Sequence, residues 1–251
     1  MFSLFLTCDP ASEDRLIADL WEQGTAGVSD EPGGLRAFFA DEQRVHELLQ
    51  QFRAYLPESR LESEVDWEQV SRDSFPPLQI GQRFFLVSPW SADPTPSGRL
   101  RLEIYPGMAC GTGRHPATQL CLEAMERHVQ PGAAVVDVGA GSGILSAAAQ
   151  LLGASLVMGC DIDPEAVEIA CSRVGAGFFI GSLDAVRSQV ADVIVANISS
   201  AVVEQLRPEF ERVRTVGGTL ILAGFPASDL PEGFAPREIY QREEWVCYVV
   251  Y

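Results

Sequence analysis

The chain contains no lysine: all eighteen of its basic residues are arginine, against thirty-five aspartates and glutamates. The resulting formal net charge of −17 at pH 7 argues against the phosphate backbone of a nucleic acid as the main partner. An acidic surface instead favours encounter with a basic protein or peptide. A genome-wide composition bias explains the missing lysine best, so we derive no function from it.

The sequence also lacks a long apolar run and a metal-binding pattern. No stretch approaches the roughly 20 apolar residues that span a bilayer, and the first residues, MFSLFLTCDPASEDR, lack the basic region of a secretory signal. We therefore expect a cytoplasmic protein without a membrane partner. With three histidines and no CxxC spacing we expect no metal site, and we interpret the cysteines as free, buried thiols. The six cysteines are Cys8, Cys110, Cys121, Cys160, Cys171 and Cys247.

The first 66 residues predict a small α+β domain. Hydrophobic periodicity and turn signals indicate, in order, a strand, a helix, a hairpin, a second helix and an edge strand. These elements occupy residues 2–8, 11–24, 25–31 with 35–41, 41–56 and 58–65. The order βαββαβ is typical of a ferredoxin-like sandwich. Residues 67–98, which are rich in proline, then form a predicted interdomain connector.

From residue 99 to residue 251 the pattern predicts a second domain of the α/β class. Strands that are apolar throughout alternate with helices, which indicates a mostly parallel, Rossmann-like sheet covered on both faces. The predicted strands are residues 134–139, 155–161, 178–181, 191–197 and 218–225. Two further strands, 237–244 and 245–251, end the chain, and we expect the second of them to be antiparallel.

The glycines that follow the first of these strands indicate the type of ligand. Gly139, Gly141 and Gly143 have the spacing GxGxG, whereas the third glycine of the dinucleotide pattern GxGxxG would fall on Ile144. Asp161 ends the next strand, where a carboxylate can accept hydrogen bonds from ribose hydroxyls. No phosphate-binding GxxxxGK[ST] motif is present. A nucleoside without a phosphate chain fits this combination, and S-adenosylmethionine is such a ligand.

Two more residues fit the ends of that ligand. Thr118 follows Pro116 in the first turn of a predicted helix, among unpaired amides that would hold a methionine carboxylate. Asn197 ends the strand predicted to lie beside the glycine strand, where its amide can face both a sulfonium and an incoming amine. His115 is either a polar ligand contact or a packed loop residue, and Ser182 is a weaker candidate near the adenine.

Four stretches together resemble the bacterial ribosomal protein L11 methyltransferase (PrmA) family. They are PGMACGTGRHPATQLCLEAM, VVDVGAGSGILSAAA with GCDIDP, ADVIVANI, and REEWVCYVV, and the resemblance covers roughly residues 66–251. It implies an S-adenosylmethionine-dependent enzyme with a seven-stranded methyltransferase sheet and an N-terminal ferredoxin-like substrate-recognition domain. It also gives cofactor-binding roles to Thr118, Gly139, Gly141, Asp161 and Asn197, with Asn197 facing the substrate as well.

The same resemblance implies methylation of lysine side chains and the N-terminal amine of a basic ribosomal protein, L11. Ser71 and the pair Ser199-Ser200 depart from the residues usual in the family. Three alternatives remain open: a relative that methylates another protein lysine or a small-molecule amine, a nucleic-acid methyltransferase, and a non-catalytic S-adenosylmethionine-binding module. The charge of −17 and ANIS in place of an aromatic clamp disfavour the second. We assign no general base, and the sequence carries no signal for the oligomeric state.

Overall fold

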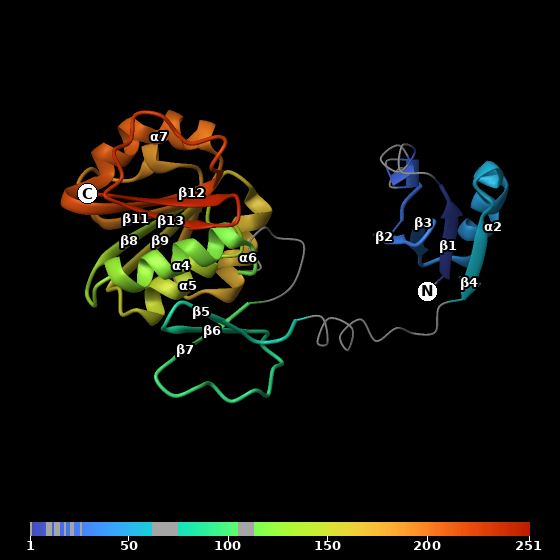
Figure 1. Ribbon diagram of the computed structural model, residues 1–251, viewed down its shortest axis with the longest axis horizontal. Helices are drawn as coiled ribbons and strands as arrows, with labels where there is room; N and C mark the ends of the chain where they lie inside the picture. The colour runs from blue at the N-terminus through green and yellow to red at the C-terminus, as the bar shows by residue number, and fades with distance from the viewer. Residues whose placement is uncertain are drawn as a thin grey trace. The chain divides into compact units, whose positions relative to one another are not determined.

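A computed structural model describes residues 2–8, 12, 16–17, 19–20, 23–25, 27–61, 75–104 and 113–251. The chain divides into two compact units, Met1–Val70 and Ser71–Tyr251, and each is considered by itself (Figure 1). Part of the predicted first helix and Ser71 fall outside the described residues. The predicted domain limits at residues 66 and 98 remain predictions.

The N-terminal unit contains a four-stranded antiparallel sheet in the order β2-β3-β1-β4. Its elements are β1 (Phe2–Thr7), β2 (Gly27–Glu31), β3 (Gly34–Phe39), α2 (Glu42–Gln51), the 3₁₀ turn η1 (Arg53–Tyr55) and β4 (Glu58–Leu61). Helix α2 begins where the Asp41 carboxylate accepts a hydrogen bond from the Gln43 amide at 3.0 Å. One face of the sheet packs on α2 because alternate residues of β1, such as Leu4 and Leu6, are fully buried with Leu48.

The C-terminal unit is built on a seven-stranded sheet in the order β10-β9-β8-β11-β12-β14-β13. Neighbouring strands are parallel from β10 to β12, and only β14 runs antiparallel to both of its neighbours. The strands are β8 (Ala134–Val138), β9 (Leu156–Asp161), β10 (Gly177–Ile180), β11 (Ala191–Asn197), β12 (Arg214–Pro226), β13 (Glu238–Arg242) and β14 (Trp245–Val250). The predicted mostly parallel α/β sheet and the antiparallel β14 are confirmed.

Helices cover both faces of this sheet because successive strand residues point to opposite sides. Val135 packs with α4 (Pro116–His128) and α5 (Ile144–Leu151) on one face. Its neighbour Val136 packs with α7 (Ser200–Val213) and the 3₁₀ turn η2 (Leu183–Ala185) on the other face. Helix α6 (Pro164–Arg173) connects β9 to β10. Figure 1 shows α4 and α5 on the side of the sheet opposite α7.

A second, three-stranded sheet lies against α4 and α5. It consists of β5 (Leu78–Ile80), β6 (Phe84–Val87) and β7 (Leu100–Glu103), and its buried side chains, including Phe84 and Leu102, join the core that contains α4. The Glu126 carboxylate on α4 accepts hydrogen bonds from the amides of Gln82 at 2.9 Å and Arg83 at 2.7 Å. The described part of the predicted connector, 75–98, is therefore folded onto the C-terminal unit.

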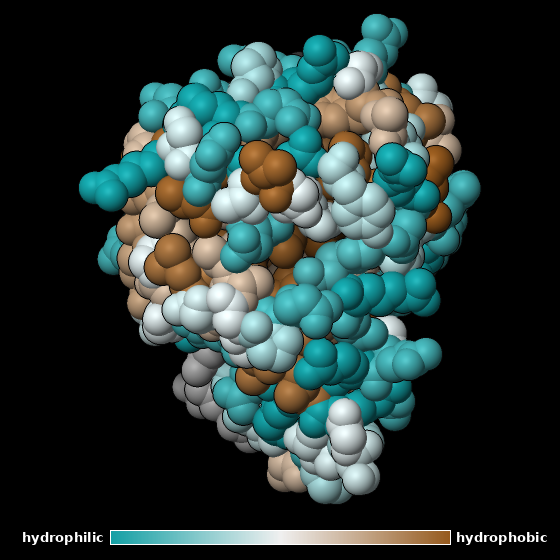
Figure 2. Space-filling view, turned by 90° about the vertical axis from the view of Figure 1, so that its left-hand side faces the viewer, coloured by the Kyte–Doolittle hydropathy of each residue, from teal (hydrophilic) through white to brown (hydrophobic). Residues whose placement is uncertain are grey.

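The surface and the cysteines of the described residues can be compared with the expectations from composition. The face in Figure 2 is covered mostly by hydrophilic residues, with hydrophobic residues in smaller patches among them. In the described part of the chain, no helix is long and apolar enough to cross a bilayer. The five described cysteines are free, as predicted, and Cys121, Cys160 and Cys247 are buried. The predicted burial is wrong for Cys171, which is exposed, and Cys8 is only partly buried. Cys110 lies outside the described residues.

We expect Phe210→Ala to lower the free energy of unfolding by about 3–5 kcal/mol, because it opens a cavity between α7 and the sheet. Phe210 is fully buried in the core on that face. The matched control is Val216→Ala, at a side chain that is 93% exposed, where the change should stay within about 0.5 kcal/mol. Urea unfolding followed by circular dichroism measures both, and equal effects would contradict this account of the core.

Candidate functional site

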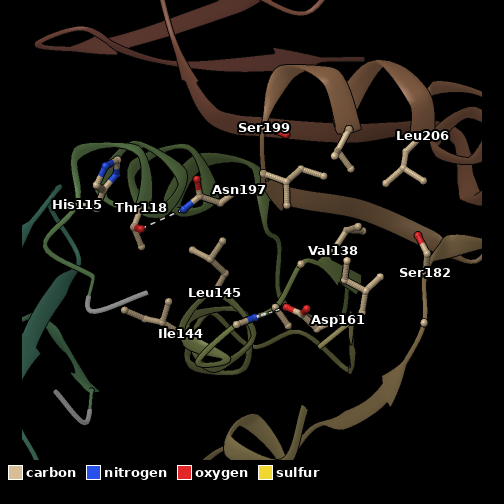
Figure 3. A pocket seen from close by; sticks show the side chains of 17 residues that line it. His115, Thr118, Val138, Ile144, Leu145, Asp161, Ser182, Asn197, Ser199 and Leu206 are labelled. Carbon is tan, nitrogen blue, oxygen red and sulfur yellow. Dashed lines mark hydrogen bonds between the residues drawn. The ribbon is translucent and has the colours of Figure 1, made fainter. Parts of the chain in front are cut away.

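The site lies at the carboxyl ends of the parallel strands. Strand β8 is flanked by β9 on one side and by β11 on the other, so the connections from these strands diverge and leave a crevice. A pocket of about 660 Å³ opens there. Its lining includes all five predicted site residues, Thr118, Gly139, Gly141, Asp161 and Asn197. The two weaker candidates, His115 and Ser182, line the same pocket (Figure 3).

The turn between β8 and α5 needs its glycines for two reasons. Gly139, Gly141 and Gly143 have φ values of +69°, +53° and +78°, in the left-handed region that other residues rarely adopt. Gly139 also lies so close to Ile198 that a Cβ atom would stand 2.5 Å from its Cγ2. A side chain at Gly139 would therefore push the β8 turn away from the end of β11.

The Asp161 carboxylate is held by backbone amides on both sides. Its Oδ2 accepts a hydrogen bond from the Gly141 amide at 2.9 Å, and its Oδ1 accepts one from the Asp163 amide at 3.0 Å. A carboxylate has about four lone-pair positions, so these two bonds leave acceptor capacity on each oxygen. The carboxylate is thus oriented at the pocket wall and can accept two more hydroxyl hydrogens, as the vicinal pair of a ribose requires.

At the other end of the pocket, α4 and β11 are joined by a side-chain hydrogen bond. Asn197 Nδ2 donates to Thr118 Oγ1 at 3.0 Å, and Thr118 is almost completely buried (Figure 3). With its amide nitrogen turned toward α4, Asn197 keeps its Oδ1 as an acceptor. An acceptor without a charge suits contact with an amine or with the carbon-bound hydrogens of a methyl group.

His115 has a role that the sequence left open. It is the N-cap of α4: its Nδ1 accepts a hydrogen bond from the Ala117 amide at 3.2 Å, so a proton on the neutral ring resides on Nε2. The ring is exposed and packs edge-on against Trp245, with centroids 4.4 Å apart. His115 therefore both caps α4 and lines the pocket.

Sequence reasoning missed the apolar part of the pocket. Ile162 follows Asp161, and Val202 and Leu206 come from one face of α7. The spacing of four residues between Val202 and Leu206, on the face beside buried Val203 and Phe210, was the available signal.

Ser199 and Ser200 stand at the start of α7, and the Ser200 hydroxyl donates a hydrogen bond to the Asp229 carboxylate at 2.5 Å. In the described residues no group of three His, Cys, Asp or Glu could hold a metal ion.

Asp137 lies beneath the glycine turn and is fully buried. Its Oδ2 accepts hydrogen bonds from the amide and the hydroxyl of Ser146 at 3.0 and 2.8 Å, but its Oδ1 has no hydrogen-bond partner among the described residues. Burial raises the pKa of this carboxyl to about 6, and the hydrogen bonds from Ser146 offset only part of the shift. The protein therefore carries an acid at its centre that resists ionisation.

Comparison with known proteins identifies the family. The sequence model of the ribosomal protein L11 methyltransferase (PrmA) family matches residues 7–251. The chain belongs to this family. It is 39% identical over 194 residues to a ribosomal protein L11 methyltransferase of Burkholderia multivorans, and 40% identical over 196 residues to that of Dechloromonas aromatica. These alignments cover 73% and 74% of this chain.

The same alignments cover 64% and 66% of the two relatives, so the chain spans just under two thirds of the length of these members of the family. Among solved structures, a ribosomal protein L11 methylase from Lactobacillus delbrueckii subsp. bulgaricus superimposes with a TM-score of 0.64 at 26% identity. The superposition covers 70% of this chain and 97% of that structure. The methyltransferase fold of the seven-stranded sheet is thus shared with a family member.

The raised pKa of Asp137 has a consequence for stability. In the unfolded chain this carboxyl returns to its ordinary pKa, near 3.8, so its contribution to stability is fully present below about pH 4 and is lost as pH rises through about 6. We expect Asp137→Asn to remove most of this loss, about 3 kcal/mol between pH 4 and 7.

Urea unfolding at a series of pH values between 4 and 7 tests this expectation. Ser146→Ala removes a donor that lowers the pKa of Asp137, so this variant should lose stability with rising pH more steeply than the parent protein. Parallel profiles for the parent protein and both variants would show that Asp137 does not control the pH dependence.

Proposed function

We propose that the protein is an S-adenosylmethionine-dependent methyltransferase that methylates lysine side chains and the N-terminal amine of ribosomal protein L11. The observation that carries the proposal is the order of groups along one pocket. Thr118 and Asn197 stand at a polar end, Asp161 in the middle, and Ser182 at the far end. An amino-acid chain, a ribose and an adenine follow one another in the same order. Family membership supports the same reaction.

In this proposal each residue acts on a defined part of the cofactor. Asp161 accepts from the ribose hydroxyls, the glycine turn admits the cofactor against the backbone, and Thr118 in the first turn of α4 lies near the methionine carboxylate. Ser182 faces the adenine. The cofactor supplies a methyl group on a positively charged sulfur, which is already a good leaving group.

In this proposal the protein contributes to the transfer by positioning the amine. A lysine ammonium with an ordinary pKa near 10.4 must lose its proton before it can attack, and an apolar pocket favours the neutral amine. Asn197 Oδ1 then accepts a hydrogen bond from the amine and aims its lone pair in line with the methyl–sulfur bond. The hydrogen bond to Thr118 restricts rotation of the Asn197 amide, so both residues share this orienting role. We assign no general base.

Recognition of the protein substrate is assigned to the predicted N-terminal domain, residues 1–66, joined by a connector, 67–98, to the methyltransferase domain, 99–251. The strand order β2-β3-β1-β4 with the helical segments between β1 and β2 and between β3 and β4 supports a ferredoxin-like fold. The acidic composition supports a basic, cytoplasmic ribosomal protein as partner in preference to a nucleic acid or a membrane.

Cofactor binding tests the ribose assignment. We expect Asp161→Asn to weaken the binding of S-adenosylhomocysteine about tenfold or more, because the asparagine amide turns one acceptor into a donor beside two backbone amides. The control is Asp163→Asn, because Asp163 caps α6 and asparagine caps equally well. Isothermal titration calorimetry measures both, and unchanged binding in Asp161→Asn would remove Asp161 from the site.

Methyl transfer tests the orienting pair. With purified L11 and methyl-labelled cofactor we expect transfer to lysine and N-terminal amines, located by mass spectrometry. Thr118→Val, which keeps the shape but removes the hydroxyl, and Asn197→Ala should lower kcat by about a hundredfold, the order expected when a reacting group loses its alignment. Thr219→Val, at a buried threonine toward the amino end of the same sheet, is the matched control. Cofactor binding without any transfer to L11 would point to a different substrate.

A further inference from the structure

The side from which the amine enters can be inferred from the sheet, given the proposed function. In the proposed function the cofactor is held by residues at β8, β9, the loop after β10 and the first turn of α4, and Asn197 at the end of β11 faces the reacting methyl group. In-line attack requires the amine to approach the methyl carbon opposite the sulfur, and we infer that it enters from the side of Asn197 away from β8 and β9. That side is formed by the ends of β12 and β14, since Asn197 pairs with Ala223 of β12, and Ala223 with Cys247 of β14.

An aromatic pair stands at that position. Trp245 is the first residue of β14, in register with Pro226 at the carboxyl end of β12, and it is partly buried. Its ring meets the ring of His115 at an interplanar angle of 72°. His115 is exposed and lines the pocket, three residues before Thr118. The His115 ring therefore lines the pocket, and the Trp245 ring packs against it.

The two neighbouring guanidinium groups contact other residues of the described chain. Arg242 donates to the side chains of Gln119 and Glu123, both at 2.6 Å. Arg114 stacks on the ring of Phe75 at 4.4 Å and donates to the Pro76 carbonyl. Arg242 is thus held by side chains of α4, and Arg114 by Phe75 and the Pro76 carbonyl, although the buried Arg114 Nε has no hydrogen-bond partner among the described residues.

Negative charge lies next to the same pair. Glu243 and Glu244 form the turn between β13 and β14, immediately before Trp245, and both are exposed. Exposed carboxylates beside an aromatic ring draw a cationic side chain toward it without binding it tightly, because the carboxylates remain hydrated. The local charge therefore agrees with the acidity of the whole chain.

We propose that His115 and Trp245 form the acceptor wall of the site and hold the positively charged lysine side chain and its methylated products by cation–π contact. In each transfer the amine lone pair forms a bond to the methyl carbon while the methyl–sulfur bond breaks, and its electron pair stays on the neutral sulfur of S-adenosylhomocysteine. The nitrogen becomes a methylammonium, which loses a proton to solvent before it can react again. The ring faces hold this cation between transfers.

A pair of probes tests the wall independently of L11. One is the amide of ε-trimethyl-lysine, and the other is its neutral isostere with a tert-butyl group in place of the trimethylammonium. We expect the protein saturated with S-adenosylhomocysteine to bind the cation about tenfold more tightly than the isostere, the order of one desolvated cation–π contact. In Trp245→Leu this ratio should fall to about one, and in Trp245→Phe part of it should remain. Equal binding of both probes to the parent protein would overturn the proposal.

A second variant separates the aromatic role of His115 from its capping role. Asparagine is a good N-cap, so His115→Asn keeps the start of α4 but removes the ring. We expect it to retain S-adenosylhomocysteine binding, to reduce the preference for the cationic probe severalfold, and to raise KM for L11 more than it lowers kcat. An unchanged preference for the cation in this variant and in Trp245→Leu would contradict the wall.

Calorimetry with S-adenosylhomocysteine alone distinguishes a failure of the proposed function from a failure of the acceptor wall. If the parent protein does not bind it, the proposed function fails before the wall is tested. If binding is normal and the parent protein transfers methyl groups to L11, but the two probes bind equally, the methyltransferase assignment stands and the acceptor wall is wrong. Thermal melting of each variant shows that it is folded.

Discussion

The hydrogen bond from the Gly141 amide to the Asp161 carboxylate is the interaction on which the rest of the site depends. It joins the turn after β8 to the end of β9, the two strand ends that form one wall of the pocket. Because the donor is a backbone amide, the carboxylate is oriented without a side-chain partner that a ligand would have to displace. The second amide, from Asp163, comes from the start of α6 and fixes the other oxygen. A ligand thus meets an acid that is already aligned.

The opposite wall follows the same principle with side chains in place of the backbone. Thr118 is placed by the first turn of α4, and that turn is capped by His115. Gly224 of β12 lies so close to the Asn197–Ile198 segment that a Cβ atom would stand 2.5 Å from the Ile198 carbonyl oxygen. The Asn197 amide is therefore held by α4 in front and by β12 behind. Both walls leave hydrogen-bond acceptors facing the pocket, which suits a ligand rich in hydroxyl and amine donors.

Much of this arrangement could be predicted from sequence because it depends on local patterns. Apolar strands, the GxGxG turn, Asp161 at a strand end and Pro116 at a helix start each carry their own signal, and parallel strands bring their carboxyl ends to one edge. The capping by His115 and its contact with Trp245 could not be predicted. These two residues are 130 positions apart, and their meeting depends on how α4 packs across β12 and β14. The buried, half-satisfied state of Asp137 likewise follows from packing that the sequence does not specify.

The antiparallel direction of β14 has a functional consequence. If β14 ran parallel to its neighbours, its last residues would lie at the ligand edge, and a crossover connection would replace the β13–β14 turn. In the observed antiparallel direction, the amino end of β14 lies at the ligand edge, and so does the turn that contains Glu243 and Glu244. One reversal of strand direction thus puts an aromatic ring and two carboxylates at the edge of the sheet where β11 ends in Asn197. In the proposed function the parallel half of the sheet binds the cofactor, and the proposed acceptor wall adds a cation-binding surface at the reversed strand.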